Sequence, residues 1–179
     1  MPDSSTWIIE TERLRLREMK IADLDFIATM LADAEVMRHY PATYDRSEAQ
    51  GWVERQRKRY AEHGHGLWLA VERASGQPVG QVGLLLRDVE GALEAEIGYL
   101  LHKPFWRQGL ATEAALGVRR YAFAAPDRSR VISLIRPANT PSQAVARRLG
   151  MALEKKVNFL NRPHLVFSVS RQTAAGTVD

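Results

Sequence analysis

A glycine-containing turn between a strand-like run and a long helical pattern is the part of the chain best suited to chemistry. Gly109 follows Arg107 and Gln108, and the helical pattern continues to about Ala124. The first N–H groups of a helix lack intrahelical partners and lie at the positive end of its dipole, so they can bind a pyrophosphate. The alternative is an ordinary turn in which glycine permits close packing. The predicted cradle consists of Arg107, Gln108, Gly109, Leu110, Ala111 and Thr112.

Two acidic residues before this turn are candidates for a general base. Glu94 and Glu96 share one face of the predicted strand because side chains alternate along a strand. Either could act as a general base, directly or through water. The alternative is an exposed carboxylate on a solvated face, and it applies more strongly to Glu94.

Motifs and residue types exclude several other kinds of site. Neither G-x-x-x-x-G-K-[ST] nor G-x-G-x-x-G occurs in the chain, so the turn is neither a P-loop nor a Rossmann fingerprint. The absence of cysteine excludes disulfides, thiolate zinc ligands and an acyl-cysteine intermediate. His63 and His65 lack companion ligands at metal-binding spacing, so we expect no metal site.

Several short motifs, in order, resemble the coenzyme-A core of the GNAT superfamily of N-acyltransferases. The motifs are Glu96-Ile97-Gly98-Tyr99, the run from Trp106 to Ala114, Asn139-Thr140-Pro141-Ser142 and Leu149-Gly150-Met151. With Thr11-Glu12-Arg13-Leu14-Arg15-Leu16-Arg17 they are most similar to the Rim-type branch, which includes ribosomal-protein N-terminal acetyltransferases. The resemblance covers about residues 10–170. One departure is Trp106, where the superfamily pattern has Gln or Arg, and it puts side-chain contacts to the phosphates in question.

The resemblance implies roles for residues beyond the cradle. Strands four and five of the family diverge, which would free backbone groups of Tyr99, Leu100 and Leu101 for the pantetheine and the thioester carbonyl. An N–H near Leu100 would then be the oxyanion donor, an interaction worth about 3–4 kcal/mol.

Proton donation to the leaving thiolate needs a different assignment from that of many family members. Their helical tyrosine is replaced here by Ala146. We therefore predict Ser142 as the thiolate proton donor and Asn139 as a pantetheine contact. The alternative is structural, since both residue types suit the first turn of a helix.

Periodicity predicts one α+β domain with a mixed sheet of about seven strands and helices on both faces. The expected strands cover 14–17, 68–72, 79–87, 95–101, 130–135, 151–160 and 164–170, and the expected helices cover 22–31, 48–60, 109–124 and a short stretch after Thr140. Ser47 and Thr140 are the predicted N-caps of the second and last helices. Residues 1–9 are expected to form an extension, 10–170 the domain and 171–179 a mobile tail. Of the residues around the first two helices, we expect most to be core and some to line the acceptor pocket: Met37, His39, Tyr40, Tyr44, Trp52 and Trp68.

Composition limits the partners and the location. The 179-residue chain carries a net charge of +4, which suits a polyanionic ligand such as coenzyme A. The basic cluster from Arg55 to Arg59 has no accompanying nucleic-acid motif, so we expect a solvated helix face. No apolar run is long enough to span a bilayer and no signal-peptide pattern opens the chain, so we expect a cytoplasmic protein. A homodimer is a candidate assembly.

These observations predict an acetyl-CoA-dependent N-acetyltransferase that transfers the acetyl group directly to a primary amine in a ternary complex. The acceptor stays open among a protein N-terminus, a metabolite amine and an antibiotic amine. A non-catalytic acyl-CoA sensor is the main alternative, supported by the missing tyrosine at Ala146. A nucleic-acid-binding module is a more distant alternative, and it would be recognised by steep salt dependence.

Overall fold

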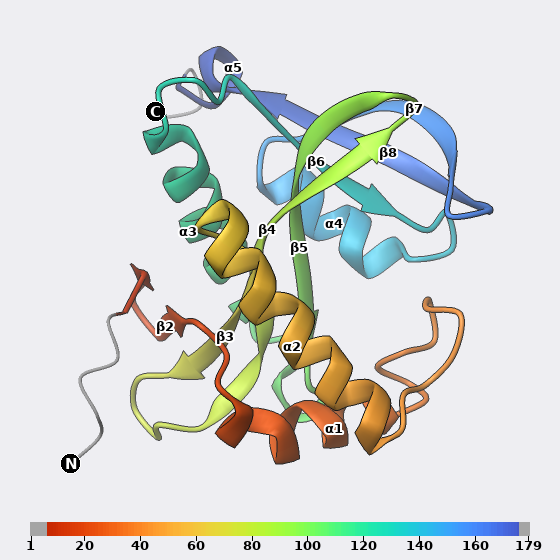
Figure 1. Ribbon diagram of the computed structural model, residues 1–179. Coiled ribbons are helices and arrows are strands. Elements are labelled where there is room, and N and C mark those ends of the chain that lie inside the picture. The colour runs from red at the N-terminus through yellow and green to blue at the C-terminus, as the bar shows by residue number, and fades with distance from the viewer. Residues whose placement is uncertain (1–6, 176–179) are drawn as a thin grey trace.

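The computed structural model describes residues 7–175, which form one sheet with helices packed on both of its faces (Figure 1). The strands are β1 (Ile9–Glu10), β2 (Leu14–Arg17), β3 (Leu67–Glu72), β4 (Pro78–Val89), β5 (Ala92–Leu101), β6 (Arg130–Ile135), β7 (Ala152–Phe159) and β8 (Arg162–Ser170). The helices are η1 (Ile21–Asp23), α1 (Leu24–Ala32), α2 (Arg46–His63), η2 (Lys103–Phe105), α3 (Leu110–Ala124), α4 (Thr140–Arg148) and α5 (Arg171–Ala175).

The strand order is β1-β2-β3-β4-β5-β6-β8-β7, and every neighbouring pair is antiparallel except β5 and β6. The predicted mixed, mostly antiparallel sheet is therefore confirmed. It has eight strands instead of about seven, because Ile9 and Glu10 pair with β2. Two residues are too few for a period-two pattern to reveal a strand.

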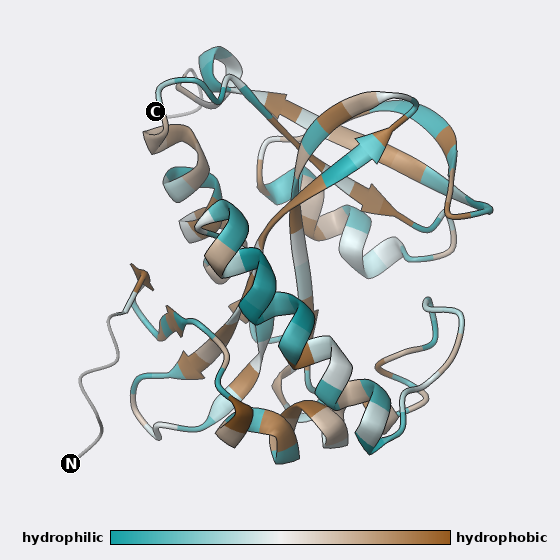
Figure 2. Cartoon of the chain, viewed as in Figure 1, coloured by the Kyte–Doolittle hydropathy of each residue, from teal (hydrophilic) through white to brown (hydrophobic). Residues whose placement is uncertain are grey.

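Alternation along the central strands divides the core between two helical layers. Trp68 and Ala70 of β3 face α3, whereas Leu67, Leu69 and Val71 face α1 and α2. Figure 2 shows the apolar central strands in brown, while much of α2 is hydrophilic. Arg55, Arg57 and Lys58 of α2 are exposed, as expected for a solvated face.

Strands β5 and β6 diverge after a single point of pairing. Glu96 is in register with Ile132, and the Ser133 hydroxyl donates to the Ile97 carbonyl at 2.8 Å. Beyond that point β5 continues to Leu101 with only β4 as a neighbour. The predicted divergence is thus confirmed, and it opens the sheet near its centre.

Two predicted helix caps are wrong by one or two residues. The N-cap of α2 is Asp45, whose side chain accepts from the Glu48 N–H while Glu48 accepts from the Asp45 N–H. This reciprocal pair satisfies two amides, whereas Ser47 lies inside the helix. The N-cap of α4 is Asn139 and not Thr140, because the Asn139 side chain accepts from the Ser142 N–H.

The two ends of the chain bear on the predicted domain limits. Residues 1–6 of the predicted extension and 176–179 of the predicted tail lie outside the described residues. The predicted tail begins with a helical turn, α5, and the Arg171 guanidinium donates to the carbonyls of Ala125 and Arg128. Mobility of the tail stays a prediction. Among residues 7–175, no helix is long and apolar enough to cross a membrane.

Candidate active site

The predicted phosphate cradle is a sharp turn that presents the start of α3. Gly109 is the N-cap and has a φ of 76°, a left-handed conformation that glycine adopts without strain. The first helical hydrogen bond runs from the Glu113 N–H to the Gly109 carbonyl at 3.0 Å. The amides of Leu110, Ala111 and Thr112 therefore precede the helical ladder and can bind an anion. Arg107 lies beside them, exposed and with a φ of 61°.

A polar cluster from the start of the chain braces this turn. Arg13 donates through Nη1 to the Gln108 carbonyl at 2.8 Å and through Nε to Glu113 at 2.6 Å. The Arg13 N–H and the Thr11 hydroxyl also donate to the Glu113 carboxylate. Burial raises the pKa of Glu113, but the hydrogen bonds from Thr11 and Arg13 outweigh it and hold the pKa below its ordinary value. Sequence reasoning missed this brace, since its members are about a hundred residues apart.

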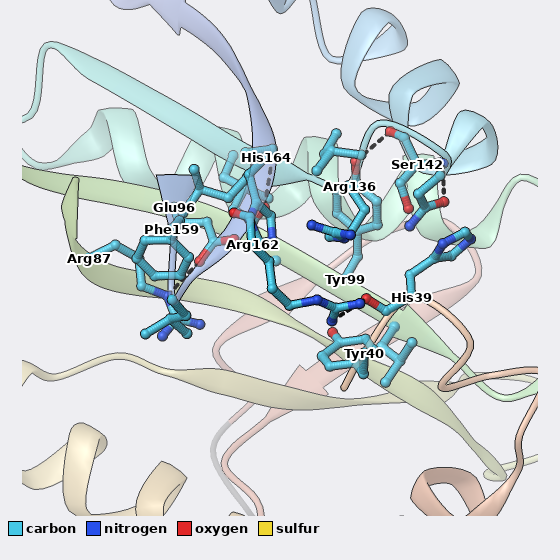
Figure 3. Close-up of a pocket in the computed structure, with 18 of the residues that line it drawn as sticks. His39, Tyr40, Arg87, Glu96, Tyr99, Arg136, Ser142, Phe159, Arg162 and His164 are labelled. Carbon is cyan, nitrogen blue, oxygen red and sulfur yellow. Dashed lines mark hydrogen bonds and ion pairs between the residues drawn. The ribbon is translucent and has the colours of Figure 1, made fainter. Parts of the chain in front are cut away.

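A cavity of about 230 Å³ lies where β5 and β6 diverge (Figure 3). Its walls come from the segment after α1, from β4, β5 and β6, from the start of α4 and from the β7–β8 hairpin. The residues predicted from sequence that line it are Glu96, Tyr99, Leu100, Asn139 and Ser142. Leu101 is instead buried in the core, and the cradle residues lie outside the cavity lining.

The backbone register determines which N–H near Leu100 faces the divergence of β5 and β6. The His102 N–H donates to the Val79 carbonyl, which makes Gly80 and Leu101 a non-hydrogen-bonded pair. By alternation, the N–H of Leu100 points toward β4, while the backbone groups of Tyr99 and Leu101 point into the divergence. The carbonyls of Ile97 and Leu101 accept side-chain hydrogen bonds on the side facing away from β4, as this register requires. Of the N–H groups near Leu100, that of Tyr99 therefore faces the divergence, and the oxyanion role of an N–H near Leu100 stays a prediction.

Tyr99 joins the cavity to the start of α4. Its hydroxyl donates to the Ser142 carbonyl at 2.7 Å, and burial raises its pKa above the ordinary value. Asn139 uses its side-chain oxygen to cap α4, through the Ser142 N–H at 3.2 Å. The structural alternative considered for Asn139 is thus present, and its contact with pantetheine stays a prediction. The Ser142 side chain lines the cavity, while Ala146 is fully buried and offers no proton donor.

Glu96 and Glu94 occupy different surroundings although they share one face of β5. Glu96 lines the cavity, its side chain is 11% exposed, and it forms an ion pair with Arg87 at 2.7 Å. Glu94 pairs with Arg130 outside the cavity lining. Beside Glu96, burial and the Glu96 charge raise the pKa of Tyr40 to about 12, so this phenol is neutral at pH 7. Of the two carboxylates, only Glu96 is placed to act on a ligand in the cavity.

The cavity also contains residues that sequence analysis did not select. Arg136 follows β6, Arg162 and His164 belong to β8, and Phe159 ends β7. The segments that contain these residues have no recognisable motif, so sequence analysis could not place them at a site. Of the residues around α1 and α2, His39 and Tyr40 line the cavity, whereas Met37 and Trp68 are core residues. Trp52 and Tyr40 line a smaller adjoining cavity.

A metal is not suggested by the side chains in residues 7–175, where no group of three or more His, Cys, Asp or Glu residues could hold an ion. His63 and His65 lie with ring centroids 6.2 Å apart, without a third ligand. His65 instead contacts the Leu84 carbonyl through Nδ1 at 2.8 Å. This pair is therefore accounted for by packing and a backbone hydrogen bond.

A model of the acetyltransferase (GNAT) domain family matches residues 13–152. The protein belongs to the GNAT family. An uncharacterized N-acetyltransferase, p20 of Bacillus licheniformis, is 30% identical over 134 residues, which are 74% of this chain and 75% of that protein. The resemblance noted in the sequence is thereby confirmed.

Solved structures extend the agreement to the whole GNAT fold. A putative ribosomal-protein-serine acetyltransferase from Vibrio cholerae superposes with a TM-score of 0.79 at 22% identity, covering 94% of this chain and 99% of that one. The aminoglycoside acetyltransferase AAC(6')-Ib, in complex with coenzyme A and kanamycin, gives 0.76 at 16% identity, with coverage of 92% and 98%. At these identities the likeness establishes the fold alone.

Proposed function

We propose that this GNAT protein transfers an acetyl group from acetyl-CoA directly to a primary amine while both substrates are bound. The observation that carries the proposal is the cavity at the divergence of β5 and β6, with Glu96 in its wall and the start of α3 nearby in the chain. Holding two reactants together in one site can contribute about 7–11 kcal/mol at best. Geometry therefore supplies most of the expected rate enhancement.

The donor would be held by backbone groups. The amides from Gln108 to Thr112 suit the pyrophosphate, since Gly109 presents no side chain and Arg13 fixes the preceding carbonyl. The backbone of Tyr99 and Leu101 suits the pantetheine, as a strand that takes the place left by β6. The Tyr99 N–H is then the oxyanion donor, an interaction worth about 3–4 kcal/mol.

Proton transfer would use side chains on opposite walls of the cavity. Glu96 removes a proton from the attacking amine, directly or through water, and passes it to solvent. The amine nitrogen bonds to the thioester carbonyl carbon and the C–S bond breaks. Ser142 is the proposed proton donor to the thiolate, since it carries a hydroxyl and is one of the residues that line the cavity. Tyr99 is less suited to this role because its hydroxyl already donates to the Ser142 carbonyl.

A non-catalytic acyl-CoA sensor is a second candidate. Two observations favour it: Arg87 engages the only carboxylate in the described cavity lining, and Ala146 offers no proton donor. Such a protein would bind acetyl-CoA and release no thiol with any amine.

The test combines ligand binding with turnover. We expect CoA and acetyl-CoA to raise the melting temperature, because a ligand that binds only the folded state stabilises it by RT ln(1 + [L]/Kd). Thiol release is then measured with acetyl-CoA and a panel of amines and N-terminal peptides. No thermal shift at millimolar CoA refutes the donor site. A shift without thiol release for any amine supports the sensor.

A further inference from the structure

The cavity lining carries two guanidinium groups, those of Arg136 and Arg162, that form no ion pair within the described chain. Arg136 donates to the Pro163 carbonyl, and Arg162 donates to the His39 carbonyl at 3.3 Å. Two other half-buried arginines have carboxylate partners: Arg17 pairs with Asp23, and Arg130 pairs with Glu94 and Glu154. Arg59, Arg119 and Arg171 instead donate to amide or carbonyl oxygens, but none of these three lines the cavity. A carbonyl satisfies hydrogen bonds but does not neutralise a charge. Arg136 and Arg162 therefore leave positive charge facing the cavity.

The other ionisable groups of the lining do not compensate that charge. Glu96 is the one carboxylate among the described lining residues, and it is engaged by Arg87 at 2.7 Å. The phenols of Tyr40 and Tyr99 and the imidazoles of His39 and His164 also line the cavity, and burial lowers the pKa of each histidine. The charges of Arg136 and Arg162 lower both pKa values further. The cavity is thus a site of positive potential that already repels a proton from two imidazoles.

Rigid backbone positions both guanidiniums. Arg162 begins β8 directly after the tight turn of Leu160 and Asn161, whose φ values are 49° and 59°. Arg136 directly precedes Pro137, and its carbonyl accepts from the Asn139 N–H at 2.9 Å at the entrance to α4. Figure 3 shows both side chains among the residues that line the cavity, with Arg162 drawn near Tyr40 and Arg136 drawn near Tyr99. Placement at strand and turn ends limits how far either charge can withdraw.

We propose that Arg136 and Arg162 bind an anionic group of the acceptor, so that the substrate class is amines that also carry a carboxylate or a phosphate. A guanidinium fork matches the oxygens of either group with paired hydrogen bonds. The same charges disfavour polycationic amines, because like charges in a partly buried site repel. This inference rests on the proposed transfer reaction and identifies the acceptor for it.

Matched amines that differ only in the anion test the inference. Thiol release from acetyl-CoA is compared for β-alanine and β-alaninamide, for O-phosphoethanolamine and ethanolamine, and for the amides of Ala-Asp and Ala-Asn. Each rate is calculated per concentration of the unprotonated amino group, so that differences in amine pKa do not enter. Spermidine serves as the polycation. We expect the anionic member of at least one pair to have a kcat/KM at least about tenfold higher, and the pair that does so identifies carboxylate or phosphate.

Two variants connect the preference with the guanidiniums. Arg136→Gln and Arg162→Gln should each raise KM for the preferred anionic amine by about tenfold. The ratio of kcat/KM for that amine to kcat/KM for its matched analogue without the anion should then fall toward one. Arg57→Gln, at an exposed position on α2, is the matched control and should keep the wild-type ratio. The acetyl-CoA-induced thermal shift should persist in all three variants.

Each outcome decides between this inference and the proposed function. Equal or better use of the neutral members and of spermidine overturns the anionic acceptor while leaving acetyl transfer intact. Loss of the acetyl-CoA thermal shift in Arg136→Gln or Arg162→Gln assigns that arginine to the donor site and also overturns the inference. A wild-type protein that binds acetyl-CoA and acetylates none of the amines refutes the proposed function and this inference with it.

Discussion

Replacing Glu113 with glutamine should weaken the brace that connects the start of the chain to the cradle. The Glu113 carboxylate accepts from the Thr11 hydroxyl at 2.6 Å, from the Arg13 N–H at 2.7 Å and from Arg13 Nε at 2.6 Å. A glutamine oxygen can keep part of this set. Its amide nitrogen cannot accept from Arg13, so a charge-assisted bond is lost at nearly unchanged shape.

The structure sets the size of the expected effect. A hydrogen bond to a charged group contributes about 1.5–3 kcal/mol to the free energy of unfolding. The Arg13 side chain is 46% exposed and that of Glu113 is 18% exposed, so solvent screening places the loss toward the lower end, at about 2 kcal/mol. For a chain of this size that corresponds to a fall of about 4–8 °C in melting temperature.

The pH dependence gives the sharper test. The folded pKa of Glu113 lies below its ordinary value near 4.5, so its contribution to stability is complete above pH 4.5 and is lost as the pH falls through the folded pKa. Calorimetry from neutral pH into acid should therefore show the largest difference between wild type and Glu113→Gln near pH 7. The difference should shrink below pH 4.5. Because Arg13 also holds the Gln108 carbonyl, we expect the Kd for CoA to rise severalfold at pH 7.

A neighbouring carboxylate provides the control. Glu12 is exposed and next to Arg13 in the chain, so Glu12→Gln removes the same charge outside the brace and should change the melting temperature by little. The predicted role of Glu113 is refuted if Glu113→Gln and the wild type have the same melting temperature at neutral pH. A melting difference that persists unchanged in acid refutes the assignment to the ionised carboxylate.

Three further substitutions test the cradle and the cavity. Gly109→Ala places a Cβ at a φ of 76° and 3.4 Å from Arg13, so it should cost about 1–2 kcal/mol and weaken CoA binding, both measurable by calorimetry; unchanged CoA affinity in the folded variant moves the phosphate site elsewhere. Ser142→Ala should lower kcat by about 100-fold with acetyl-CoA KM little changed, whereas wild-type turnover would assign the thiolate proton to water or another residue. Tyr99→Phe removes the hydrogen bond to the Ser142 carbonyl and should lower the melting temperature by about 2–4 °C; an unchanged melt would show that this bond adds no net stability.

Local sequence patterns predicted the helices and strands well, because each type of element has its own hydrophobic periodicity. The strands 14–17 and 130–135 were predicted to the residue, and the helix predicted from about Gly109 begins at Leu110 and ends at Ala124 as expected. The cap at Asp45 was missed although the Asp-x-x-Glu signature is present in the sequence, since Ser47 offered a competing cap. The turn at Gly109 was predictable for the same reason, because it depends on one contiguous segment, while its binding of a phosphate stays a prediction.

The rest of the site depends on register and on distant contacts, which local patterns do not contain. Whether Leu100 or Tyr99 presents its N–H to the divergence follows from pairing with β4, and a shift of one residue exchanges them. Arg136 and Arg162 line the same cavity only because β6 and β8 are antiparallel neighbours, so that β6 ends where β8 begins. Nothing in their local sequence distinguishes them from other surface arginines.

The single point of pairing between β5 and β6 also divides the molecule along its chain. Strands β1 to β5 all precede α3, and β6, β7 and β8 all follow it, so one exposed link at Pro126 and Asp127 connects the two sets. A cut there would sever no strand. Helix α3 would stay on the first fragment and would present the apolar surface that the second fragment packs against. We expect the two fragments to reassemble when co-expressed. Any ligand that spans the divergence would touch both fragments, so its binding and their association would be thermodynamically linked.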